Sequence, residues 1–286
     1  MTRDPAAPAP EEPLAESAPL AWRLAEEQCR GCAWNHGLWQ YLRLLGLVTS
    51  PSHQPGFYRE ALAGVDAPSP RVLVSGAADY AMLAVVLDAF RARKAQPRVT
   101  VIDLCETPLA LSRWYAERFS ARIETRAADI RDYEPQELFD AVCSDNFFGR
   151  FRHEERAAVV AKWKALLRPA GIAVTASRVR PGEGTAAVRF DAAQRQAFCD
   201  AVRRAADSRP DLEKQADAIA ARAALYAEKH FTYPLAGVDE LRELFTGAGF
   251  RIEQLDTAQA AAGNRQAASG PSVRGFQSYA RLVARA

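Results

Sequence analysis

Short apolar runs alternate with amphipathic segments through the middle of the chain. The runs Val72–Ser75, Val99–Ile102 and Ala141–Ser144 have the length of buried strands, and the segments between them repeat apolar residues at helical spacing. This alternation predicts right-handed crossovers and a doubly wound, Rossmann-like parallel sheet, so we expect an α/β fold. Further strands are predicted at Arg122–Thr125 and Ile172–Ala176, and helices at Tyr80–Arg93, Pro108–Phe119 and Glu154–Leu167.

The flanks of this region have mainly helical patterns. Before it, apolar residues such as Leu38, Leu42 and Leu45 recur three and four positions apart, which predicts a helical N-terminal lid over residues 20–66. After it, two patterns with apolar residues on only part of their faces predict an inserted helical cap over residues 185–235. The chain then returns to core elements, with a helix predicted at Val238–Thr246 and strands at Phe250–Leu255 and Gly275–Val283.

Composition narrows the class of protein. A net charge of +2 over 286 residues gives no strong positive field, so we expect no nucleic-acid and no membrane partner. No apolar run approaches the roughly 18 residues of a membrane span. Five cysteines, an odd number, favour a reducing compartment, and we predict a cytoplasmic protein. Residues 1–19 are rich in Ala, Pro and Glu and lack the pattern of a secretory signal, so a disordered tail is predicted there.

Small and acidic residues follow the predicted strands. Gly76 comes after the first strand, Asp103 ends the second, Asp129 follows the third and Asp145 ends the fourth. The carboxyl ends of parallel strands meet at one edge of a sheet, where glycine admits a ligand close to the backbone and a carboxylate accepts ribose hydroxyls. The pattern predicts a cleft for an adenosine-containing cofactor. A helix N-cap for Asp103 and a solvated loop for Asp129 are the alternatives.

Together these segments resemble the class I S-adenosylmethionine-dependent methyltransferases of the small-molecule type. Two pieces are more specific than the strand ends: Leu167-Arg-Pro-Ala-Gly171 before a strand, and Val238–Phe250 leading into one. The resemblance covers a domain of residues 67–286. It implies a seven-stranded sheet with a final antiparallel hairpin strand, and S-adenosyl-L-methionine as the cofactor.

The resemblance also implies roles for the strand ends. Asp103 would hold the ribose, while Asp129 and the backbone at Ile130 would contact the adenine. The first turn departs from the family because Ala78 stands at the second glycine position, and we hypothesise that Asp79 pairs with the methionyl amine. The predicted cofactor-binding residues are Ser75, Gly76, Ala77, Ala78, Asp79, Asp103, Leu104, Cys105, Asp129, Ile130 and Ser144.

Reacting groups are predicted at the end of the fourth strand and on the lid. Asp145 can act as a base or hold the methionyl amine, and Asn146 can orient an acceptor heteroatom. His36 is the predicted base on the lid because the reference pKa of histidine lies near neutrality. The predicted catalytic residues are therefore His36, Asp145 and Asn146.

Aromatic and basic residues near the same mouth are predicted to hold the acceptor. An aromatic and polar stretch on the lid suits closure over a small substrate, and Arg178 with Arg180 can form a fork for a carboxylate. Core packing is the alternative for the aromatic residues, a surface role for the arginines, and a turn anchor for Tyr233. The predicted substrate-binding residues are Trp34, Tyr41, Phe147, Phe148, Arg178 and Tyr233.

Two cysteines and a histidine on the lid have spacings at which they can meet on a metal or form a redox pair. Cys29, Cys32 and His36 supply three ligands, but a closed zinc site needs a fourth, and His53 is the only near candidate. We therefore predict no metal and interpret these cysteines, like Cys105, as packing residues.

These patterns predict an enzyme that moves a methyl group from S-adenosylmethionine to a small molecule by in-line displacement. The sulfonium is already a good leaving group, so alignment and exclusion of water dominate the work of the protein. Two alternatives stay open: cyclisation of the aminobutyrate arm, of the azetidine-2-carboxylate type, with release of methylthioadenosine, and a degenerate cofactor-binding partner subunit. The sequence leaves the acceptor and the oligomeric state open, a homodimer included.

Overall fold

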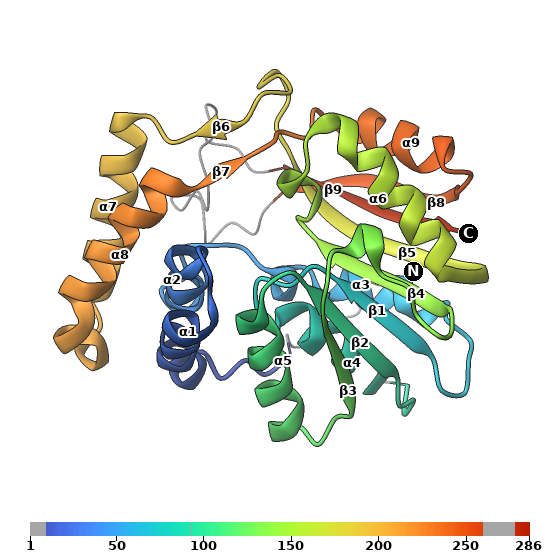
Figure 1. Cartoon of the computed structure of the whole chain (residues 1–286), viewed down its shortest axis with the longest axis horizontal. Helices are drawn as coiled ribbons and strands as arrows, with labels where there is room; N and C mark the ends of the chain where they lie inside the picture. The colour runs from blue at the N-terminus through green and yellow to red at the C-terminus, as the bar shows by residue number, and fades with distance from the viewer. Residues whose placement is uncertain (1–9, 92, 260–277) are drawn as a thin grey trace, which may run out of the picture.

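One sheet of seven strands organises the protein (Figure 1). The computed structural model describes residues 10–91, 93–259 and 278–286. The strand order is β3-β2-β1-β4-β5-β9-β8; the first five strands of that order pair in parallel, and β9 is antiparallel to both β5 and β8. The predicted fold class is confirmed. The strands are β1 Arg71–Ser75, β2 Arg98–Asp103, β3 Ile123–Ala127, β4 Phe139–Asp145, β5 Leu167–Val179, β8 Arg251–Gln259 and β9 Ser278–Arg285.

Strand β1 lies at the point where the strand order reverses. It pairs with β2 on one side and β4 on the other, so that Val74 is opposite Val101 and also opposite Cys143. The connections after this strand and after its neighbour β4 run toward opposite edges of the sheet, and this leaves a crevice at the carboxyl ends of the two strands. The fold therefore supplies a ligand position before any polar side chain is considered.

Helices cover both faces of this sheet. Successive strand residues point to opposite faces: Val72 and Val74 belong to one buried cluster and Leu73 to the other. The first face is covered by α3 (Pro55–Ala63), α4 (Ala81–Arg91) and α5 (Glu106–Arg118), and the second by α6 (His153–Leu166) and α9 (Val238–Gly247).

Lid and cap helices share a third core. Figure 1 shows α1 (Leu14–Gln28) and α2 (Ala33–Leu44) between the sheet domain and the cap helices. Leu38 and Leu42 of α2 are buried in the same cluster as Ile219 and Ala223. The cap helices, which fall within the predicted insertion, are α7 (Ala192–Asp207) and α8 (Ala216–Lys229), and they are linked to the domain through the short strands β6 (Val188–Arg189) and β7 (Phe231–Thr232).

The N-terminal boundary differs from the prediction. Helix α1 begins at Leu14, so the predicted tail is wrong for residues 14–19. Ala18, Ala21 and Ala25 are fully buried at helical spacing, which outweighs the proline-rich composition. Residues 1–9 of the tail and residues 275–277 of the last predicted strand lie outside the described residues. Among the helices that the structure describes, none has the length and apolar content to cross a membrane.

Candidate functional site

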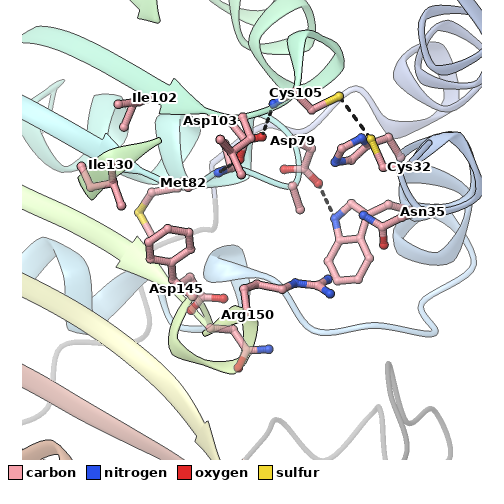
Figure 2. A pocket seen from close by; sticks show the side chains of 18 of the residues that line it. Cys32, Asn35, Asp79, Met82, Ile102, Asp103, Cys105, Ile130, Asp145 and Arg150 are labelled. Carbon is pink, nitrogen blue, oxygen red and sulfur yellow. Dashed lines mark hydrogen bonds between the residues drawn. The ribbon is translucent and has the colours of Figure 1, made fainter. Parts of the chain in front are cut away.

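A cavity of about 490 Å³ opens at the carboxyl edge of the sheet. Residues from the turns after β1, β2, β3 and β4 line it, and residues of α2 and of the segment before α3 close it from the lid side. In Figure 2, Asp79, Asp103 and Asp145 come from three different strand ends around this space. Gly76 and Asp129 line it too, so the strand ends meet in one hollow as predicted.

The turn after β1 requires glycine at position 76. Gly76 has a φ of +74°, and a Cβ there would lie 2.3 Å from the ring of Phe147. Phe147 packs parallel to Trp163, with ring centroids 6.2 Å apart, so the ring cannot easily move away. The missing side chain thus lets Phe147 close one wall of the cavity.

Asp103 is held by two backbone donors. Its Oδ2 accepts from the N–H of Ala77 at 3.0 Å, and its Oδ1 accepts from the N–H of Cys105 at 2.8 Å. Burial raises the pKa of the Asp103 carboxyl, and these hydrogen bonds oppose that rise. The N-cap of α5 is Cys105, so the N-cap alternative for Asp103 is not realised. Each carboxylate oxygen has two accepting sites, which leaves one on each for a pair of hydroxyls.

Asp129 and Ile130 form the next part of the wall. Asp129 caps the short helix η2 (Ile130–Asp132) by accepting from the N–H of Arg131 at 2.9 Å. Its carboxylate also pairs with the Arg131 guanidinium at 2.7 Å, and this hydrogen bonding holds the pKa of Asp129 below its usual value. Ile130 is buried and lines the cavity beside it.

Asp145 ends β4 against a buried tyrosine. Tyr58 of α3 lies with its hydroxyl 3.0 Å from Oδ1 of Asp145 and 3.0 Å from the carbonyl oxygen of Ser144. Burial raises the pKa of Asp145 to about 7; the hydrogen bond from Tyr58 opposes this rise, and the charge of Asp79 adds to it. A carboxyl with such a pKa can take up and release a proton near neutrality.

Asn146 is fixed in position by its backbone and its side chain. It has a φ of +52°, and its N–H donates to the carbonyl of Ala176 at 2.7 Å. Its Oδ1 accepts from the N–H of Arg178 at 3.1 Å, so Nδ2 is the donor that this side chain can offer a ligand.

Asp79 joins the lid to the first turn. Its Oδ2 accepts from Trp39 at 2.8 Å and from Arg43 at 2.9 Å, and its Oδ1 accepts from the N–H of Ala81 at 2.5 Å. Arg43 and Asp79 are both almost completely buried. A ligand amine at Asp79 would therefore have to share a carboxylate that a buried guanidinium already neutralises.

His36 lines the cavity from the lid, with its Nδ1 3.4 Å from the thiol sulfur of Cys29. Burial lowers the pKa of His36 to about 4, and the nearby charge of Arg150 adds to this effect. The imidazole is therefore neutral at pH 7. Trp34 lines the same side, with its ring centroid 5.6 Å from that of Tyr226 in the cap.

A second, smaller cavity of about 50 Å³ adjoins the first and is strongly basic. Arg150, Arg178 and Arg180 all line it, together with His230 and Tyr233. Arg150 also lines the large cavity, as do Trp39 and Asn146.

The arginines of the small cavity are only partly neutralised. Arg178 is 6% exposed, and its Nη2 has no hydrogen-bond partner among the described residues. Arg180 lies 3.3 Å from Glu183, and burial lowers its pKa to about 10, with the charge of Arg178 adding to the effect. Both side chains remain cations, because arginine is not deprotonated in proteins. The arrangement can accept an anion.

Four of the predicted site residues line neither cavity. The hydroxyl of Ser75 faces α6, where it accepts from Trp163 Nε1 at 3.0 Å. Ser144 is fully buried. Both side chains sit in the sheet core because strand residues alternate between its two faces.

The other two are aromatic residues for which the packing alternative holds. Tyr41 is buried between lid and cap, and its hydroxyl donates to Gln215 at 3.0 Å. Phe148 packs against Trp163 and Phe245, with centroid distances of 5.3 and 6.2 Å. Every other predicted cofactor-binding residue, as well as Trp34, His36, Phe147, Asp145 and Asn146, lines the large cavity.

Sequence reasoning missed several residues of the site. Arg150 comes shortly after the end of β4, and its position next to Asp145 and Asn146 was a usable signal. Trp39 stands in the aromatic stretch of the lid, where nothing distinguished it from its neighbours. Tyr58 and Arg43 gave no signal, because their partners Asp145 and Asp79 are distant in the chain.

Comparison with known proteins agrees with this geometry. A family model described as a methyltransferase domain matches residues 84–171. No curated protein matches the sequence at a significant level.

Solved structures share the fold over most of the chain at low sequence identity. The 1,6-didemethyltoxoflavin-N1-methyltransferase of Burkholderia thailandensis, solved with 1,6-didemethyltoxoflavin and S-adenosylhomocysteine, superposes with a TM-score of 0.52 at 16% identity, covering 99% of this chain and 92% of that one. Magnesium protoporphyrin IX methyltransferase of Synechocystis PCC 6803, solved with S-adenosylmethionine, gives 0.51 at 12% identity, covering 90% and 95%. The [4+2]-cyclase SpnF gives 0.51 at 16% identity, covering 81% and 80%. Residues 84–171 thus match a methyltransferase domain, and the chain as a whole shares the fold of these solved structures.

Proposed function

We propose that this chain is an S-adenosyl-L-methionine-dependent methyltransferase whose acceptor is a small molecule with an anionic group. The observation that carries this proposal is the convergence of Asp103, Asp129 and Asp145 on one cavity at the switch point of the sheet. Ligands of open α/β sheets bind at that point. The cavity is within the usual volume range for small-molecule sites.

Residues at the tips of β1, β2 and β3 would hold the cofactor. Asp103 accepts both ribose hydroxyls through the lone pairs that Ala77 and Cys105 leave free. The adenine would lie against Ile130 and Leu104; Leu104 is 74% exposed and would be covered by a flat ring. Gly76 and its neighbours pass beneath the sulfur-bearing arm.

The end of β4 would face the methyl group that the bound cofactor supplies. Methyl transfer needs the nucleophile, the carbon and the sulfur in one line, with water kept out. Phe147 and the lid residue Trp39 supply apolar walls there. Asn146 orients the nucleophilic atom through Nδ2, and Asp145 accepts its proton, since a carboxylate with a pKa of about 7 is half ionised near neutrality.

The anionic group of the acceptor lies toward the small basic cavity. Arg150 borders both cavities and Arg178 has an unpartnered nitrogen, so a carboxylate can bridge them while the rest of the acceptor reaches the large cavity. This pairing relieves the mutual repulsion of buried guanidinium groups. It therefore favours acidic acceptors over neutral ones.

His36 is the other base that the sequence predicted. A group with a pKa of about 4 is a weaker proton acceptor than one near 7, and its Nδ1 is directed at a thiol. We therefore assign the proton transfer to Asp145.

Binding of the cofactor product tests the proposal first. Titration of the full chain with S-adenosylhomocysteine in a calorimeter is expected to give one bound molecule per chain. A chain that binds no S-adenosylhomocysteine contradicts the proposal, and such a chain that also forms a stable complex with another chain favours the degenerate partner subunit.

Product analysis then separates transfer from cyclisation. Incubation with S-adenosylmethionine and a panel of small carboxylic acids is expected to release S-adenosylhomocysteine and a methylated acid. Methylthioadenosine formed without any acceptor would instead support cyclisation of the aminobutyrate arm.

A further inference from the structure

Three thiols and one imidazole converge where the lid meets the sheet domain. The ligand atoms of Cys29, Cys32, His36 and Cys105 all lie within 4.8 Å of one another. Figure 2 shows Cys32 and Cys105 facing each other beside Asp103. Methyl transfer as proposed above requires none of these four side chains, so their convergence needs a separate explanation.

Three helix ends place these thiols. Cys29 is the C-terminal cap of α1, Cys32 the N-terminal cap of α2, and Cys105 the N-terminal cap of α5. Two of the three sulfurs therefore lie at the N-terminal ends of helices, and the third lies at the C-terminal end of α1. His36 is one turn after Cys32 on the same face of α2, which brings its ring to the same point.

The distances match the edges of a small tetrahedron. The sulfur of Cys105 lies 3.4 Å from that of Cys29 and 3.6 Å from that of Cys32. Nδ1 of His36 lies 3.4 Å from the sulfur of Cys29. Tetrahedral zinc with sulfur at about 2.3 Å and nitrogen at about 2.0 Å sets such edges at roughly 3.5–3.8 Å. Three of the six donor distances thus match these edges and the other three are at most 4.8 Å, so shifts of about 1 Å let the four atoms surround one ion.

A further polar group supports the cluster from outside. The hydroxyl of Thr107, which is buried, lies 3.1 Å from the sulfur of Cys29. A hydroxyl in this position can donate a hydrogen bond to a metal-bound thiolate, which is a usual outer contact of such ligands. Cys199, by contrast, lies on cap helix α7 and is no part of the cluster.

We propose that Cys29, Cys32, His36 and Cys105 bind one zinc ion in a closed, structural Cys₃His site. Zinc accepts three thiolates and one imidazole in tetrahedral geometry and needs no open position for such a role. A disulfide between two of the cysteines would leave the third thiol and the imidazole without a function, although all four donors converge. This proposal differs from our sequence-based prediction of no metal, which considered only His53 as a fourth ligand, because Cys105 is distant from the lid in the sequence.

The ion would tie the lid to the cofactor side of the cavity. Cys29 and Cys32 belong to the α1–α2 corner, whereas Cys105 follows the β2 turn that carries Asp103. Binding of an ion by both parts makes the closed position of the lid part of the folded state, because the free energy of metal binding adds to that of folding.

Metal analysis of the whole chain tests the proposal. Protein purified under reducing conditions without added metal is expected to contain about one zinc per chain by elemental mass spectrometry. Cys29→Ser and Cys105→Ser are expected to retain roughly a tenth of that zinc or less. Cys199→Ser is the matched control and is expected to keep its full zinc content and thermal stability.

A second readout does not depend on whether the variants fold. Exchange of zinc for Co²⁺ in the unmutated chain is expected to give the visible bands of tetrahedral cobalt and a thiolate charge-transfer band, and chelation is expected to lower the melting temperature. The proposal is overturned if the chain neither contains nor takes up zinc. In that case the thiols of Cys29, Cys32 and Cys105 would react freely, or two of them would form a disulfide. Failure of S-adenosylhomocysteine binding in a zinc-containing chain would count against the methyltransferase proposal alone.

Discussion

The two sides of the cavity carry opposite charges and are built differently. On the sheet side, Asp103, Asp129 and Asp145 stand at successive strand tips, each held by hydrogen bonds. On the side next to His230 and Thr232 at the end of the cap, called the cap side below, Arg150 after β4 and Arg178 of β5 line the adjoining basic cavity.

This contrast explains how one hollow can hold two ligands in order. Acceptor atoms on the sheet side suit hydroxyls and a sulfonium cofactor, while guanidinium donors on the cap side suit an anion. A cationic cofactor on one side and an anionic acceptor on the other also attract each other across the reacting centre. Substitutions on the two sides are therefore expected to affect different kinetic constants.

The largest effect is expected at Asp145. Asp145→Asn keeps the shape of the side chain but removes the proton acceptor, so kcat is expected to fall by about 100-fold or more. Steady-state kinetics with an identified acceptor would measure the fall, and binding of S-adenosylhomocysteine is expected to change little. An unchanged kcat would contradict the base role. A weakened affinity for S-adenosylmethionine with an intact rate would instead assign Asp145 to the methionyl amine.

The next largest effect is expected on the basic side. Arg178→Met removes the buried donor with an unpartnered nitrogen, and KM for a carboxylate acceptor is expected to rise by roughly 30-fold, the loss of one charge-assisted hydrogen bond. The exposed Arg203 of α7 offers the matched control, Arg203→Met, which should behave like the unmutated chain. If the acid and its neutral amide are methylated equally well, the anionic acceptor is ruled out.

On the sheet side, Asp103→Ala is expected to weaken S-adenosylhomocysteine binding by about tenfold or more. Calorimetry measures the change, and Asp132→Ala, an exposed carboxylate outside the cavity, is the control. If both variants bind S-adenosylhomocysteine with the same affinity, Asp103 does not bind the ribose.

The smallest effect concerns the pH dependence of the rate. Tyr58 lowers the pKa of Asp145 by hydrogen bonding, whereas burial raises it to about 7; Asp79 and Tyr279 are its other titratable neighbours. The rate should therefore fall as the pH drops through about 7. Tyr58→Phe is expected to move this acid limb to higher pH by up to about one unit. Tyr115→Phe is the control, because the hydroxyl of Tyr115 donates to the backbone carbonyl of Glu11 and not to Asp145. If the acid limb of the pH–rate profile moves to lower pH or does not move, the ionisation of Asp145 does not control the rate.

The same pKa has a consequence for stability. The folded pKa of Asp145 lies above its unfolded value of 3.8, so its contribution to stability is full below pH 3.8 and is lost as the pH rises through about 7. Asp145→Asn is expected to reduce this loss, which melting temperatures at pH 5.5 and pH 8 would show. An equal loss of stability in both proteins would place the pH dependence elsewhere.

The sheet side could be predicted from the sequence because it follows local rules. A short apolar run ends in an acid, and parallel strands bring such ends together, so Asp103, Asp129 and Asp145 were placed from their neighbours alone. Ser75 and Ser144 were misplaced because their side chains point into the core, which depends on the alternation at the strand end.

The lid and cap sides could not be predicted in this way. Trp39 and Arg43 take their roles from Asp79, and Cys105 takes its place beside Cys29, through contacts between distant segments. Nothing in the local pattern of the lid distinguishes a residue that lines the cavity, such as Trp34, from one that packs against the cap, such as Tyr41. The packing of helices decides this, and it has no local sequence signal.

A crystal structure of the full chain with S-adenosylhomocysteine would test the central claim most directly. The ribose hydroxyls are expected on the Asp103 carboxylate, the adenine against Ile130, and the sulfur facing Asp145 with Arg150 across the empty acceptor space. Density for the ligand elsewhere, or a nucleoside whose ribose does not touch Asp103, would contradict the account.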